Sequence, residues 1–269
     1  MQRKPIVAGQ FYPGDEASLR LTVKKLMPED GDRDVKRSLL VMVPHAGYMY
    51  SGGVMGLTLS QANLAGRCIL MGPNHTGRGV PLSVWTQGSW QVPTGELAVD
   101  EALAAGILSQ VPGAEPDVEA HMGEHSLEVL CPFLLEINPA MTIVPICVAL
   151  RSAEALFQTG MALGKLLAAE QEPVTIVVSS DMSHYISAEN AREQDGQALA
   201  NVVSLNAQGL LETVVQRQIS MCGVQPMVVG MLAAMEMGAS AARITGYSTS
   251  GDVTGDNSSV VGYAGAIIS

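Results

Sequence analysis

The sequence predicts an α/β protein, with one domain over residues 1–269 in which a sheet is packed between helices. Short, continuous apolar runs, typical of strands buried on both faces, alternate with segments of helical periodicity. No repeat or low-complexity linker divides the chain, and 269 residues suffice for one large domain. Apolar residues make up 47% and charged residues 15% of the chain, which indicates a well-buried core.

Three of the apolar runs end in a polar turn that carries a histidine. The pairs are residues 39–43 with His45, residues 68–71 with His75, and residues 174–178 with His184. In an open α/β sheet, ligands bind beyond the carboxyl ends of the strands. If the three strands are parallel neighbours, the three histidines converge at one edge of the sheet.

The remaining elements follow from periodicity and turn signals, taken in chain order. The entry segment, residues 1–14, contains two aromatic residues and is expected to dock on the rest of the protein. A charged loop is expected over residues 28–36. Helices are predicted over residues 15–26 with Asp15 as cap, and over 51–62, 100–110, 126–137, 152–170 with Ser152 as cap, 188–205, 207–216 and 226–237. Further strands are predicted over residues 82–85 and 90–92, as a hairpin or edge excursion, and over 141–148, 242–248 and 259–268.

Composition argues against several classes of protein. A net charge of −11 disfavours nucleic acid as a partner. The four cysteines form no CxxC pair, so no disulfide framework is expected. The chain shows neither the apolar core of a signal peptide nor an uninterrupted apolar stretch of about 18 residues, which favours a soluble, cytoplasmic protein without membrane contact. A P-loop, a GxGxxG after a strand, GxSxG and HExxH are absent from the sequence, so nucleotide-dependent and serine-hydrolase chemistry lose support.

His45, His75 and Cys222 are candidate metal ligands. Each histidine directly follows a buried strand beside glycine and proline, which favours a functional role over that of a turn histidine satisfied by backbone. Cys222 precedes Gly223 at the start of a predicted helix, where a thiolate is stabilised, although for Cys222 alone a buried thiol that fills space is the better interpretation. Together the three suit zinc, copper or iron.

Two further pairs carry possible acid–base chemistry. Asp181 and His184 can form a metal ligand with a base, or a hydrogen-bonded pair behind the metal; Asp181 as a helix cap is an equal alternative. His125 and Glu128 lie three residues apart at the start of a predicted helix and so on one face, where an exposed ion pair is almost as good an interpretation. Tyr48 can offer its hydroxyl to a substrate or roof the pocket.

Six motifs, in this order, resemble the Memo family over essentially the full chain: AGQFYP, PHAGYMYSG, GPNHTG, EHSLEVLCPFL, SSDMSHY and MCGVQP. Prokaryotic members are similar to the Memo part of the AmmeMemoRadiSam system, which implies an AMMECR-like protein and a radical SAM protein as partners. The fold that the resemblance implies is that of class III extradiol ring-cleaving dioxygenases, a three-layer sandwich with a mixed central sheet and helices on both faces.

By the resemblance, His45, His75 and Cys222 form the metal site, and Asp181 and His184 lie in the same pocket. His125 is expected in that pocket too, lined further by Tyr48, Asn74 and Glu128. The related dioxygenases use two histidines and a carboxylate on iron(II), so a thiolate as third ligand departs from their facial triad.

The expected function is therefore that of a metal-dependent redox enzyme of dioxygenase-like type. Iron(II) is the expected metal, with copper or zinc as alternatives, and the substrate is an unidentified small molecule. His184 would serve as acid and base, with Asp181 orienting it or the metal. Two alternatives remain open: a non-enzymatic metal-binding scaffold that recognises a peptide or protein partner in a former dioxygenase pocket, and a zinc hydrolase.

Overall fold

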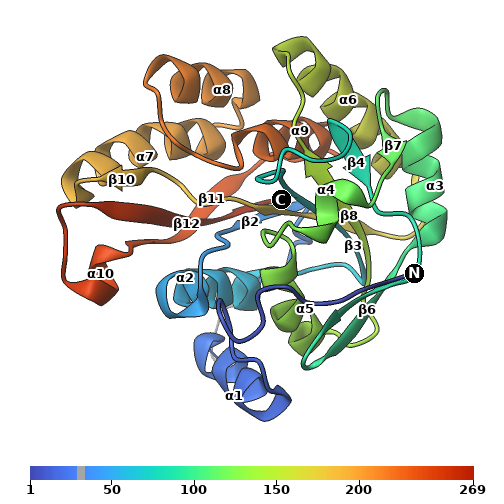
Figure 1. Cartoon of the computed structure of the whole chain (residues 1–269). Helices are drawn as coiled ribbons and strands as arrows, with labels where there is room; N and C mark the ends of the chain where they lie inside the picture. Colours follow the sequence, from blue (N-terminus) through green and yellow to red (C-terminus); the bar gives the residue numbers. More distant parts are fainter. Residues whose placement is uncertain (29–33) are drawn as a thin grey trace.

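The computed structural model describes residues 1–28 and 34–269, whose strands form a single mixed sheet (Figure 1). The expected charged loop over residues 28–36 falls largely outside this part of the chain. The strands are β1 (Gln2–Arg3), β2 (Leu40–Val43), β3 (Arg67–Pro73), β4 (Leu82–Val84), β5 (Ser89–Val92), β6 (Gly95–Val99), β7 (Glu115–Pro116), β8 (Thr142–Val148), β9 (Val174–Ser179), β10 (His184–Ile186), β11 (Ala242–Thr249) and β12 (Val260–Ile268).

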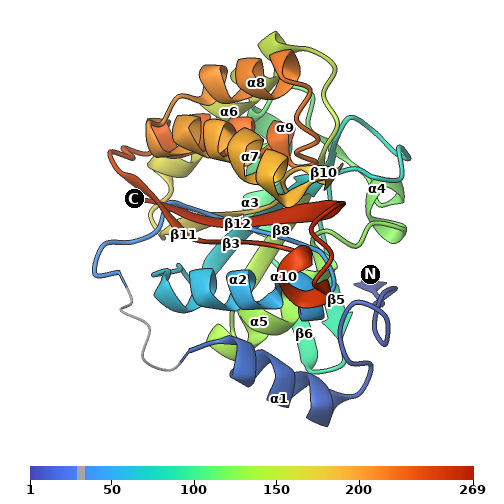
Figure 2. The same cartoon turned by 90° about the vertical axis from the view of Figure 1, so that its left-hand side faces the viewer.

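Helices cover both faces of this sheet, so the predicted mixed sheet with helices on both faces is confirmed (Figure 2). One face carries α1 (Glu16–Leu26), α2 (Tyr48–Gln61) and α5 (Cys131–Ile137). The other carries α3 (Glu101–Gln110), α6 (Ala153–Ala169), α7 (Ala188–Val203), α8 (Ala207–Gln216) and α9 (Val224–Glu236). Short helical turns complete the set: α4 (Glu119–Met122), the 3-10 turn η1 (Glu128–Leu130) and α10 (Gly251–Thr254). Over residues 1–28 and 34–269, none of the helices has the length and apolar character needed to cross a membrane.

Five parallel strands form the middle of the sheet. The main order is β1-β5-β6-β8-β3-β9-β2-β12-β10. The strands from β6 to β2 along this order run parallel, whereas β12 pairs antiparallel with both β2 and β11. The three strands predicted to end in histidine turns, β3, β9 and β2, are therefore parallel neighbours, as the sequence suggested.

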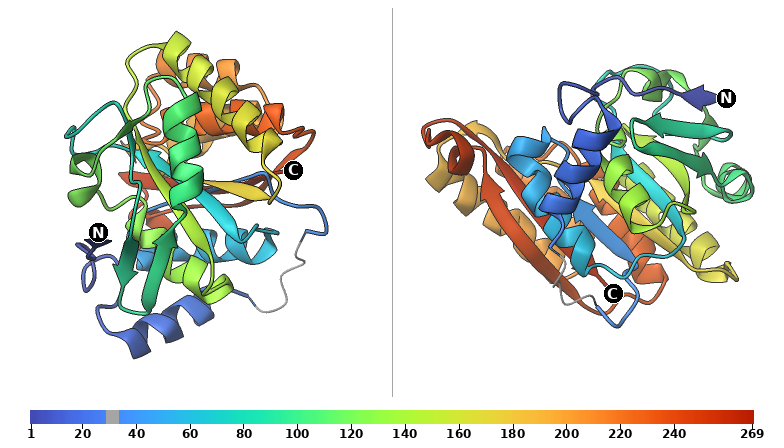
Figure 3. Two further views of the ribbon diagram at one scale, coloured as in Figure 1. Left: turned by 90° about the vertical axis from the view of Figure 1, so that its right-hand side faces the viewer. Right: turned by 90° about the horizontal axis from the view of Figure 1, so that it is seen from below.

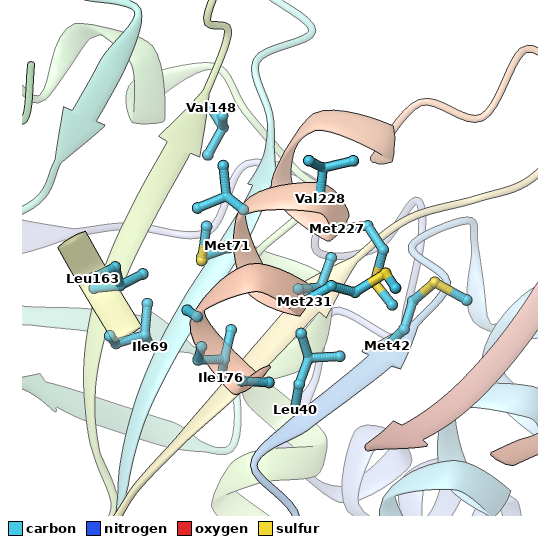
Figure 4. Close-up of a cluster of buried hydrophobic side chains, with 14 of the residues drawn as sticks. Leu40, Met42, Ile69, Met71, Val148, Leu163, Ile176, Met227, Val228 and Met231 are labelled. Carbon is cyan, nitrogen blue, oxygen red and sulfur yellow. The ribbon is translucent and has the colours of Figure 1, made fainter. Parts of the chain in front are cut away.

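The apolar runs supply both sides of the core because successive strand residues point to opposite faces. In β2, Leu40 and Met42 pack with α9, whereas Val41 and Val43 pack on the α2 face. Figure 4 shows the first of these clusters, where Met227 and Met231 of α9 lie over the strands. The methionines of the predicted helix over residues 226–237 thus belong mainly to the core.

Several element predictions need correction. Helix α2 begins at Tyr48 rather than Ser51. The hairpin is formed by β5 and β6, whereas β4 pairs with β8 (Figure 3). The chain does not become helical at Ser126 but at Glu128, as a single 3-10 turn before α5. The sequence patterns located the apolar segments correctly but could not show which segments pair.

The entry segment docks, as expected. Tyr12 is buried, and β1 pairs with β5. Arg3 is buried as well and forms an ion pair with Glu128 at 2.7 Å. Glu128 also accepts hydrogen bonds from the Tyr12 hydroxyl and from the backbone N–H groups of Ile6 and Val7. This buried carboxylate fixes the N-terminal segment against the body of the protein.

Candidate metal centre

Three histidine side chains meet at the carboxyl edge of the parallel strands. His45 follows β2, His75 follows β3, and His125 precedes η1. One ligand atom from each lies within 4.8 Å of the others. The rings of His75 and His125 are stacked with centroids 5.2 Å apart, and both face His45 edge-on. The sequence suggested convergence of His45, His75 and His184; in the structure His125 takes the third place in this tight group.

His45 is held with one ring nitrogen free. Its Nδ1 lies 2.6 Å from Ser179 Oγ, and the Ser179 hydroxyl donates to the Ser126 carbonyl at 2.7 Å. The serine oxygen must therefore accept from Nδ1–H, which leaves the lone pair on Nε2. Burial lowers the pKa of His45 well below its usual range, and the adjacent His75 and His125 lower it further. The neutral ring is the form that binds a metal.

Glu124 fixes His75 in the same way. Its carboxylate accepts from the backbone N–H of His75 at 2.6 Å and from Nδ1–H at 2.9 Å, so His75 Nε2 is also free. It also accepts from the Ser126 N–H at 2.9 Å, and its other histidine neighbour is His125, with Nδ1 at 3.7 Å. Burial raises the pKa of Glu124, but the hydrogen bonds from His75 and Ser126 outweigh it and bring the pKa to about 2. A carboxylate behind a histidine is the usual partner of a metal-binding imidazole.

Cys222 lies next to His45, with its Sγ 3.3 Å from His45 Nε2. The next residue, Gly223, precedes α9, and a Cβ atom at Gly223 would collide with Ser180. Glycine therefore allows the cysteine turn to approach the strand end. The predicted lowering of the Cys222 pKa by the helix start is wrong, because burial and the Asp181 carboxylate raise it. Without a cation in the pocket, Cys222 is a neutral thiol.

Asp181 lies beside His45 and Cys222, and His184 follows it in the chain by three residues. Asp181 accepts from the backbone N–H of His45 at 2.7 Å rather than capping a helix. Burial raises the pKa of Asp181 to about 6, against the hydrogen bond from His45. His184 Nδ1 lies 3.0 Å from the Ser220 carbonyl, so Nδ1 carries the proton and Nε2 is free to accept one. His184 is only partly buried.

The three residues expected to line the pocket, Tyr48, Asn74 and Glu128, each hydrogen-bond neighbouring parts of the protein. His125 and Glu128 do not share a helix face, because the chain is not helical at His125 and Glu128 points to Arg3 and Tyr12. The Tyr48 hydroxyl donates to the Val129 carbonyl at 2.7 Å. Asn74 holds its own turn by donating to the Arg78 carbonyl and accepting from the Gly77 N–H.

Sequence reasoning missed three residues that shape the centre. Glu124, Ser179 and Phe11 contact the histidines, and Phe11 packs on His125 with ring centroids 4.8 Å apart. Glu124 stands beside His125 in the EHSLE motif, but adjacency in the chain does not show that it binds His75. Ser179 ends an apolar strand and gives no signal of its own.

The fold and this pocket define a mixed α/β protein with a histidine cluster at the sheet edge that could hold a metal ion.

Comparison with known proteins agrees with the six motifs. The model of the family described as "Memo-like protein" matches residues 3–267. A "MEMO1 family protein" of Aquifex aeolicus is 41% identical over 266 residues, covering 98% of each chain. Another, of Methanosarcina barkeri, is 37% identical over 268 residues and covers 99% of each. The chain belongs to the Memo family.

A solved structure supports the fold. The "uncharacterized protein JW3007 from Escherichia coli K12" matches with a TM-score of 0.55 over 86% of this chain and all of that chain. Its sequence is 16% identical, so this likeness concerns the fold alone.

Proposed function

We propose that the chain is a metal-dependent redox enzyme of dioxygenase-like type that acts on a small organic substrate. The observation that carries the proposal is the convergence of three histidine ligand atoms within 4.8 Å of one another, with the Cys222 thiol 3.3 Å from His45. Three neutral donors leave coordination positions for other ligands on an iron or copper ion.

The donor set fits a transition metal. His45 and His75 each donate their Nδ1 proton to a neighbouring oxygen and keep Nε2 free. We assign His45, His75 and Cys222 as ligands. His125 is a further nitrogen donor, because it forms the group of three close ligand atoms with His45 and His75, whereas Cys222 lies beside His45. Imidazole with a soft thiol suits iron, copper and zinc, and excludes magnesium and calcium, which prefer oxygen. We propose iron(II) as the metal, with copper as the alternative.

A redox-active ion held there would supply one-electron chemistry that no side chain can provide. The protein's own groups would handle protons and orientation. His184 Nε2, unprotonated in this arrangement, would take a proton from the substrate and return it later. Asp181 positions His45 through the backbone hydrogen bond, and its pKa of about 6 allows it to carry a proton near neutral pH.

Anaerobic metal analysis tests this proposal on three proteins: wild type, Cys222→Ser and Cys68→Ser. Cys68 is a fully buried thiol on β3, away from the centre, and serves as the matched control. We expect stoichiometric iron or copper in wild type and in Cys68→Ser, and its loss in Cys222→Ser. Stoichiometric zinc would favour hydrolysis instead. No metal after anaerobic reconstitution, or loss only in Cys68→Ser, would contradict the assignment.

For partners, we propose an AMMECR-like protein and a radical SAM protein. The support is the family itself, through the resemblance of its prokaryotic members to the Memo part of that three-protein system. Co-purification of the tagged chain with each candidate at equal concentration tests it, and elution of all three as separate species would contradict it.

A further inference from the structure

A groove outside the histidine cluster runs between the N-terminal segment, α1 and the start of α2. Its volume is about 680 Å³, within the range of pockets that hold small organic ligands. Its walls are mainly apolar and aromatic, formed by Phe11, Leu21, Leu26, Tyr48, Met49 and Tyr50. We call it the α1–α2 groove.

Two apolar side chains of this groove are unusually exposed for their type. Leu21 is 71% and Met49 68% exposed, although the protein has room for such residues in its two cores. Apolar side chains gathered around a hollow mark a ligand-binding or protein-binding site more often than a chance arrangement. The buried Glu128 network fixes the segment that carries Phe11, so the groove is already formed without a ligand.

The charge in the lining of the groove is positive, and it comes from Lys25. On the same helix, Arg20 pairs with Glu16 and Lys24 with Glu136, whereas Lys25 has no ion-pair partner within residues 1–28 and 34–269. In a chain of net charge −11, an apolar hollow with a lysine and no carboxylate in its lining is complementary to an anion.

The groove adjoins the histidine cluster through Phe11. The Phe11 ring packs on His125, and its carbonyl accepts from the Tyr48 N–H at 2.8 Å. Tyr48 and its neighbour Gly47 continue directly from the His45 turn. A molecule seated in the groove therefore lies against Phe11, which packs on His125, and against Tyr48, which follows His45 by three residues in the chain.

We propose that the α1–α2 groove binds the apolar body of the substrate, and that this substrate is an organic monoanion, a carboxylate, with its acidic group on Lys25. The inference rests on the proposed function, because it takes the histidine cluster as the place of reaction. One flexible lysine without an arginine suits a carboxylate better than a phosphate, which proteins usually grip with several donors.

Calorimetric titration with two ligands of equal shape tests the inference. The probes are 4-biphenylcarboxylate and the neutral 4-biphenylcarboxamide, added to the full-length protein and to variants. We expect the carboxylate to bind more tightly than the amide. Lys25→Gln should weaken the carboxylate about fivefold and leave the amide unchanged, as for loss of one exposed charge pair. Leu21→Asp should weaken the carboxylate more than tenfold, because it adds a negative charge and removes apolar surface.

Lys24→Gln is the matched control, since Lys24 is adjacent in the chain, equally exposed and outside the groove. It should change neither affinity. Equal binding of the two probes, or equal losses in Lys24→Gln and Lys25→Gln, would overturn the inference. So would a dimer in size-exclusion chromatography that Leu21→Asp dissociates while no carboxylate binds, because the groove would then join two copies.

Metal content measured on the same samples separates the two proposals. Lys25-dependent carboxylate binding in a protein that takes up no metal would leave the groove assignment standing and reject the redox function. Normal metal content without carboxylate binding would reject the groove alone. In copper-loaded protein, saturating carboxylate should shift the electron paramagnetic resonance spectrum through Phe11 and His125; an unchanged spectrum would contradict the link between groove and centre.

Discussion

Two close histidine–cysteine pairs lie within residues 1–28 and 34–269, and one of them adjoins the histidine cluster that could hold a metal ion. His45 Nε2 and Cys222 Sγ are 3.3 Å apart, and His121 Nδ1 and Cys147 Sγ are 3.5 Å apart. The first pair lies in a pocket with two further histidines. The second is fully buried, with Trp85 and Trp90 edge-on to the His121 ring.

The charged groups around the two pairs differ. The centre of His45 is flanked by Glu124 and Asp181, both carboxyl groups. His121 also lies near two carboxylates, Asp117 and Glu124, but it faces Arg3 as well, whose positive charge adds to burial in lowering the His121 pKa to about 4. The Arg3 charge opposes a cation beside the second pair. The spacing of one histidine and one cysteine therefore does not distinguish the two pairs; the number of convergent donors does.

Removing the histidine of each pair in turn should give the largest difference between the two pairs. We expect His45→Ala to lower metal affinity more than about a thousandfold, because the ring provides a ligand and orders its neighbours. His121→Ala should keep full metal content while lowering stability by about 2–4 kcal/mol through a cavity beside Trp85. Metal content by mass spectrometry and urea unfolding measure both. Loss of metal from His121→Ala with a native far-UV spectrum would refute the distinction.

The buried pair should make the protein acid-sensitive. In the unfolded chain His121 is protonated below about pH 6.5, whereas in the native state its pKa is lowered to about 4, so it stays neutral until that pH. Stability therefore falls as the pH falls through this window, by about 3 kcal/mol from this histidine. Urea unfolding of wild type and His121→Gln at pH 7 and pH 4.5 measures the difference. Equal pH dependence in the two proteins would disprove it.

A smaller effect should come from the carboxylate behind His75. Glu124→Gln keeps the size of the side chain but removes the charge that favours the Nδ1–H form of His75. We expect metal affinity to fall about 10- to 100-fold. Competition with a chelator of known affinity measures it, and Glu119→Gln, an exposed position on α4, is the control. An affinity within a factor of two of wild type would show that Glu124 has no such role.

The smallest effect should be that of Cys147→Ser. The serine hydroxyl can still hydrogen-bond His121 or the Ala120 carbonyl, so the loss of stability should be about 1 kcal/mol with no loss of metal. Thermal unfolding and metal analysis together check it. Metal loss in Cys147→Ser would mean that the second pair also takes part in metal binding.

The strand ends were predictable, and the pairing behind them was not. Apolar runs before His45 and His75 fixed two strand termini, and because parallel neighbours share an edge, the two side chains were expected together. His125 lies in a non-helical turn. Such a turn has no sequence periodicity, so periodicity offered no reason to place His125 beside His45 and His75. Ser179 and Glu124 bind their histidines across 134 and 49 residues of sequence, and such tertiary hydrogen bonds leave no local pattern.

The electrostatic prediction for Cys222 failed for a related reason. A helix start favours a thiolate, but that local effect was outweighed by burial and by Asp181, which lies 41 residues earlier in the chain. The order of the six motifs, in contrast, predicted the fold correctly, because a resemblance over the whole chain does not depend on any single contact.

The separation of the proposed donors along the chain bears on when a metal could be bound during synthesis. His45 and Cys222 touch across 177 residues. During synthesis, His45, His75 and His125 leave the ribosome long before Cys222 does. The proposed donor set is therefore complete only after Cys222 has emerged and α9 has packed. On the proposed assignment, a chain stalled before Cys222 would present the histidines without the thiol and would compete for the ion with an incomplete set of ligands.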